Sequence, residues 1–65
     1  MAVTTDDMRK ARLAYVQDAE RAMLMLRTDV SLDSYSLFCS ADAVLSVLNA
    51  MRQAIHDHYD KLEQQ

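Results

Sequence analysis

The sequence predicts an all-α protein, an antiparallel two-helix hairpin with coiled-coil-like packing. First, the 65 residues include no glycine and no proline, whereas average usage is about 7% and 5%. Tight turns with positive φ and sharp helix breaks are therefore disfavoured. Second, the only interior cluster of polar, cap-forming residues is Thr28 to Ser36. Third, apolar residues recur at heptad spacing on both sides of that cluster.

The first helix is expected to cover about residues 5–28. Thr4 is a good N-cap, and Asp7, three residues further on, can complete a capping box. Acidic side chains in the first turn also complement the positive end of the helix dipole.

The connection is expected at about residues 29–36 and the second helix at about residues 37–63. Ser31, Asp33 and Ser36 are alternative N-caps for the second helix, and the pattern does not choose among them. A chain of this length is expected to form a single domain, residues 1–65.

Each predicted helix carries a seam with alternating spacings of four and three residues, the a/d pattern of a coiled coil. We expect the two seams to pack against each other inside the hairpin. The first seam is Met8, Arg12, Tyr15, Ala19, Ala22 and Leu26, and the second is Leu37, Ala41, Val44, Leu48, Met51, Ile55, His58 and Leu62.

Arg12 is the residue of the first seam that breaks its apolar pattern. One interpretation is that its stem lies on Met8 and Met51 while its charged head reaches water. The other is that a polar seam residue fixes the register or accepts an acidic group of a partner.

A second apolar strip flanks each seam, because successive helical residues are about 100° apart. Two helices alone leave such strips exposed, and helical domains bury their apolar faces against another layer. We therefore expect a partner to complete a bundle, either a second copy, giving a four-helix bundle, or a different helical protein. The expected contact residues are Leu13, Val16, Leu24, Phe38 and Leu45.

The sequence does not predict an enzyme, a metal site or a bound cofactor. His56 and His58 are separated by about 200° on a helix, so they cannot hold one ion together. Cys39 is the only cysteine, and no acid, base and nucleophile are spaced to meet at it.

Composition also limits compartment and partners. A lone thiol and no N-terminal apolar segment favour a reducing cytoplasm. The longest apolar run, Ala22 to Leu26, is far too short to span a membrane. The formal net charge of −3 disfavours nucleic acid as a partner. An alternative function nevertheless stays open, a homodimeric four-helix-bundle regulator that binds RNA through basic residues on the outside of the first helix, namely Arg9, Lys10, Arg21 and Arg27.

The second predicted helix begins with the run "YSLF", Tyr35 to Phe38, and Leu45 follows seven residues after Phe38. In this feature, in length and in its hairpin plan, the chain resembles the small needle-subunit co-chaperones of type III secretion. The resemblance implies a cytoplasmic co-chaperone that binds a helical-repeat chaperone and helps to keep a needle subunit unassembled. The residues that it implies as contacts are Tyr35, Leu37, Phe38 and Leu45.

These observations together predict a non-enzymatic protein-interaction module, a helical hairpin that binds another protein through apolar helix faces.

Overall fold

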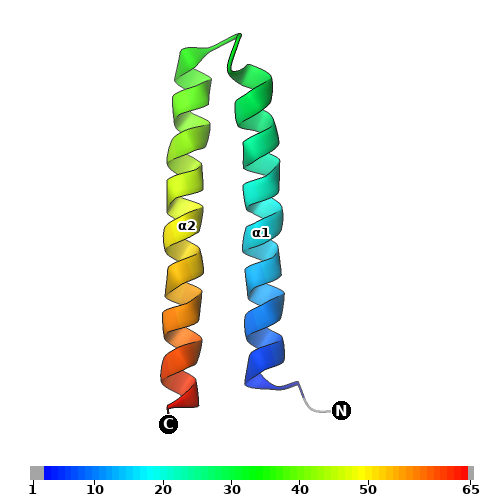
Figure 1. The fold of residues 1–65 in the computed structure, drawn as a ribbon, viewed down its shortest axis with the longest axis vertical. Helices are drawn as coiled ribbons and strands as arrows, with labels where there is room; N and C mark the ends of the chain where they lie inside the picture. Colours follow the sequence, from blue (N-terminus) through cyan, green and yellow to red (C-terminus); the bar gives the residue numbers. More distant parts are fainter. Residues whose placement is uncertain (1–2, 65) are drawn as a thin grey trace.

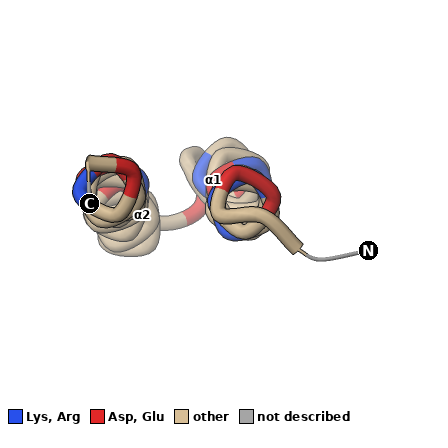
Figure 2. The backbone as a smooth tube through the Cα atoms, turned by 90° about the horizontal axis from the view of Figure 1, so that it is seen from below, with Lys and Arg blue, Asp and Glu red and all other residues tan. Residues whose placement is uncertain are grey.

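The computed structural model describes residues 3–64, which form two helices, α1 (Thr5–Val30) and α2 (Tyr35–Glu63). The helices run antiparallel and side by side, so the start of α1 and the end of α2 lie at the same end of the hairpin (Figure 1). Seen along the helices they form a layer one helix thick (Figure 2), with Cα extents of 49 × 22 × 8 Å. The predicted all-α antiparallel hairpin is confirmed.

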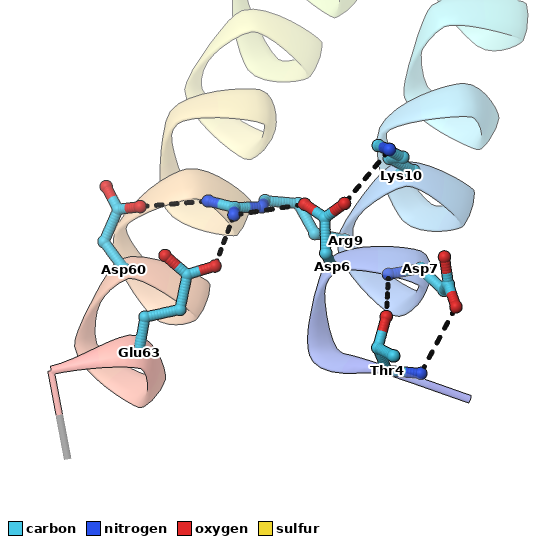
Figure 3. A network of polar contacts seen from close by, with 7 residues as sticks. All are labelled: Thr4, Asp6, Asp7, Arg9, Lys10, Asp60 and Glu63. Carbon is cyan, nitrogen blue, oxygen red and sulfur yellow. Dashed lines mark hydrogen bonds and ion pairs between the residues drawn. The ribbon is translucent and has the colours of Figure 1, made fainter. Parts of the chain in front are cut away.

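The capping box predicted at the start of α1 is present (Figure 3). The Asp7 backbone N–H donates to the Thr4 hydroxyl at 3.0 Å, and the Thr4 N–H donates to the Asp7 carboxylate at 3.3 Å. Two backbone donors that the helix itself cannot satisfy are thereby paired.

The connection is shorter than the sequence predicted and uses a different cap. α1 continues to Val30, and α2 begins at Tyr35, with Ser34 as its N-cap. The Ser34 hydroxyl accepts the Leu37 N–H at 3.2 Å, so Ser31, Asp33 and Ser36 were wrong as cap candidates. Ser31 instead ends α1, donating its hydroxyl to the Thr28 carbonyl at 2.9 Å.

The turn needs no glycine, which explains how a chain without this residue can reverse direction. No described residue has positive φ. The Ser31 backbone remains right-handed helical, with φ −61° and ψ −30°, and Ser34 is extended.

The predicted seam of α1 was wrong by one residue. Val16 is only 5% exposed, whereas Tyr15, its predicted counterpart, is 73% exposed. The side chains of α1 that turn toward α2 follow the same 4-3 spacing, shifted by one position. They are Arg9, Leu13, Val16, Glu20, Met23, Arg27 and Val30.

On α2 the predicted seam is correct only in part. Ala41 is buried, and Leu48 and Ile55 are half-buried, as expected. Tyr59, which the prediction omitted, is the least exposed residue described, at 3%. The other seam residues are exposed: Leu37, Val44, Met51, His58 and Leu62.

The physical reason for the shift is that each helix has two adjacent strips with heptad spacing, about 100° apart. The strip that faces inward contains Arg9 and Arg27 on α1 and Arg52 on α2, and each of these arginines reaches a carboxylate on the other helix. The predicted seam of α1 therefore turns out of the layer, and on α2 the exposed seam residues Leu37, Val44, Met51 and His58 do the same.

We predict that Val16→Ala lowers the free energy of unfolding by roughly 2 kcal/mol, because it removes two buried carbons and leaves a cavity. Met25→Ala is the matched control, because Met25 is 70% exposed. Urea titration followed by circular dichroism at 222 nm measures both. An equal effect of the two substitutions would contradict the register described above.

Candidate functional site

The two faces of the helix layer differ in chemistry. On one face, which we call the ion-paired face, side chains from the two helices form charge pairs at three levels. Arg27 contacts Asp42 at 2.8 Å near the turn, and Arg52 contacts Glu20 near the middle. Arg9 contacts Asp60 at 3.0 Å near the chain ends.

Arg9 is the centre of the largest of these clusters (Figure 3). Its guanidinium also contacts Glu63 on α2 and Asp6 on its own helix. The Arg9 side chain is 17% exposed, while its three carboxylate partners are about half exposed. A cation with several acidic partners holds the open end of the hairpin together better than an isolated surface pair would.

Lys10 lies beside this cluster and binds Asp6 at 3.0 Å. Its hydrogen bond and charge lower the pKa of the Asp6 carboxyl, and the same pair raises the pKa of Lys10. Arg9, Lys10 and Arg27, three of the four basic residues in the RNA-binding alternative, are thus each paired with a carboxylate within the chain. Among the basic residues of α1, this leaves Arg12 and Arg21 outside the ion pairs of the described residues.

The opposite face is apolar, and we call it the apolar face. It consists of the predicted seam residues that the structure leaves exposed, together with Val47. The sequence analysis missed Val47, although it lies one turn from both Val44 and Met51. Its exposed members are Met8, Arg12, Tyr15, Ala22 and Leu26 on α1, and Leu37, Val44, Val47, Met51, His58 and Leu62 on α2.

Two open grooves run along this face between the helices. The groove near the turn has a volume of about 290 Å³ and is lined by Met23, Leu26, Val30, Leu37, Ser40, Ala41 and Val44. The groove near the chain ends, of about 380 Å³, is lined by Met8, Arg12, Ala54, Ile55, His58, Tyr59 and Leu62. Because both grooves draw on both helices, they fit side chains from another helical layer.

Arg12 is the charged residue of α1 in the apolar face. Its guanidinium lies 5.8 Å from the centre of the Tyr59 ring and makes a 3.4 Å hydrogen bond to the Met8 carbonyl. The arginine therefore covers the end of the core with its stem and stacks on an aromatic ring.

The predicted partner-contact residues fall into two groups. Leu13, Phe38 and Leu45 are half-buried and Val16 is buried, so these four pack inside the hairpin and do not form an outer strip. Leu24, Tyr35 and Leu37 are exposed. They are not contiguous, because Leu24 lines a hollow on α1 with Arg21 and a second hollow that also includes Arg52 of α2, at the ion-paired face.

The residues that could carry chemistry lie apart. Within residues 3–64 no three His, Cys, Asp or Glu side chains are grouped so as to hold a metal ion. Cys39 is exposed. Hydrogen bonding and charge at the Cys39 side chain, one turn away, raise the pKa of Tyr35. His58 packs edge-on against the Tyr59 ring, with the two ring centres 4.9 Å apart.

Neither described helix is long and apolar enough to cross a membrane. Comparison of the chain with protein-family models, with curated protein sequences and with solved structures finds no match.

We predict that the ion pair between Arg27 and Asp42 contributes about 0.5–1 kcal/mol, the upper range for partly exposed pairs. Asp42→Arg alone should lower the free energy of unfolding, and adding Arg27→Asp should recover most of the loss. A double-mutant cycle in urea at low and high salt measures the coupling. Strictly additive effects of the two substitutions would mean that the pair does not hold the helices together.

Proposed function

We propose that this protein is a non-enzymatic protein-interaction module that works by burying its apolar face against helices of a partner. The observation that supports the proposal is the contrast between the two faces. One is crossed by charge pairs at three levels, whereas the other leaves Val47 61% and Met51 49% exposed along its length. Apolar surface gathered on one face, with a polar rim, is typical of a protein–protein interface.

The small core of the hairpin also supports the proposal that a partner covers the apolar face. Only three described residues are buried, namely Val16, Ala41 and Tyr59. Helical chains of this size usually need a partner, a metal or disulfides to reach ordinary stability. Burying apolar surface contributes roughly 25 cal/mol for each Å² removed from water, so covering the apolar face would stabilise the hairpin and the complex together.

The resemblance to co-chaperones of type III secretion suggests one class of partner, a cytoplasmic helical-repeat chaperone. Of the four residues that the resemblance implies as contacts, Tyr35 and Leu37 are exposed, at 80% and 55%. Phe38 and Leu45 turn into the hairpin. Support for this finer proposal therefore rests on the first turn of α2, next to the groove at the turn end.

We predict that the apolar face is protected from solvent inside the cell. In a Cys39→Ser background, Val44→Cys places a thiol on the apolar face, and Asn49→Cys places one on the ion-paired face. A membrane-permeant maleimide applied to cells that natively produce the protein should label the first thiol at least about tenfold more slowly than the second.

Labelling of both variants after denaturation is the reference, because it gives the reactivity of each thiol without any structure around it. The proposal does not depend on which protein covers the face. Equal labelling of the two thiols in cells would contradict it.

A further inference from the structure

We infer that the layer covering the apolar face is a second copy of this chain, turned end for end, so that two hairpins form an antiparallel four-helix bundle. This inference rests on the proposed function, because it names the partner that the apolar face takes.

The whole hairpin exposes more surface than a compact monomer of its mass, by about the area of one ordinary interface. The hairpin exposes 5083 Å², whereas a compact monomer of 7.4 kDa exposes about 4,200 Å² by the mass scaling of folded proteins. The excess is about 900 Å², close to the roughly 800 Å² that each partner buries in a standard-size interface.

The apolar face is also the width of two helices. Tyr15 on α1 and Val47 on α2, the most exposed large side chains of the face, lie toward its opposite edges. A single helix of another protein, bound in the central grooves, would leave both edges exposed to solvent. A second hairpin, stacked about 8–10 Å away, covers both edges and turns the 8 Å layer into a bundle.

The apolar face is complementary to itself when it is reversed. The middle of α1 lies near Asp18. It is roughly level with Met51 on α2, because the Arg9–Asp60 and Arg27–Asp42 contacts lie equally far to either side of these two residues. Tyr15 lies just before the middle of α1, and Ala19 and Ala22 lie just after it.

Reversal of one copy about this middle level therefore places each Tyr15 ring over the small side chains Ala19 and Ala22 of the other copy. On α2 the same operation brings the two Met51 side chains together, each with Ala54 one turn away to make room. Large residues packed against small ones let two helical layers interdigitate.

Reversal also separates the charges of the face. With the copies in the same orientation, the Arg12 and His58 ends of the two apolar faces would stack on each other. With the copies antiparallel, the two Arg12 residues lie roughly 15–20 Å apart along the bundle, and each arginine keeps its contact with Tyr59 of its own chain.

The test is the molar mass of the purified full-length chain by size-exclusion chromatography with light scattering, over a range of concentrations. We expect a dimer. Met51→Asp should raise the dissociation constant at least about tenfold, because it places an unpaired charge in the interface. Asn49→Asp is the matched control, about 200° away around α2, and should leave the dimer intact.

Cross-linking tests the orientation independently of stability. In a Cys39→Ser background, Met51→Cys should form an interchain disulfide under mild oxidation, because the antiparallel arrangement brings the two positions together. Leu62→Cys should not, since its two copies would be roughly 30 Å apart. Cross-linking through Leu62→Cys, or a dimer insensitive to Met51→Asp, would overturn the inference.

A purified chain that stays monomeric at every concentration would also overturn the second copy as the occupant. The proposed function would survive that result if the Val44→Cys thiol were protected in cells but reactive in the purified chain, because a different protein would then cover the face. A monomer whose thiol is unprotected in both settings would contradict both proposals.

Discussion

The rest of the structure depends on how far each helix is rotated about its own axis. Each helix offers two adjacent strips with heptad spacing, and only one of them can face the other helix. Charge pairs across the hairpin stabilise the observed rotation at three levels, through Arg9, Arg27 and Arg52. Each pair is worth at most about 1 kcal/mol, but together they can decide between two rotations of similar apolar content. The rotation that satisfies them leaves the more continuous apolar strips on the opposite face.

The sequence was sufficient to predict that two helices form and where α1 starts. Without glycine or proline, little competes with helix, and Thr4 and Asp7 make a recognisable capping box. The end of α1 was harder to predict, because several serines and aspartates there can cap. Ser34 was missed because cap geometry depends on the backbone of the turn, in which Ser34 is extended and able to accept the Leu37 N–H.

The interior of the hairpin could not be predicted from apolar periodicity alone. Tyr15 and Val16 belong to strips of nearly equal spacing. The prediction placed Tyr15 in the seam because it is in line with Ala19, Ala22 and Leu26. The information that decides between them is non-local. It lies in which arginines find carboxylates on the other helix, and so depends on how the two chain segments are aligned. For the same reason the two predicted sets of residues exchanged places. Val16 and Leu45, predicted as partner contacts, turn into the hairpin, whereas Val44 and Met51, predicted as seam residues, turn outward.

Two heptad strips per helix can thus serve two interfaces, one within the chain and one with its partner. The most direct test is isotope-filtered NMR on a dimer with one labelled and one unlabelled copy, or on the labelled chain alone if it is monomeric. The structure predicts nuclear Overhauser contacts from the Val16 methyls to α2 of the same chain and none from the Tyr15 ring to that helix. The inferred dimer adds contacts from the Tyr15 ring to the other copy. Contacts within one chain from Tyr15 to Leu48, with Val16 facing solvent, would contradict the rotation of the helices and with it the assignment of the apolar face.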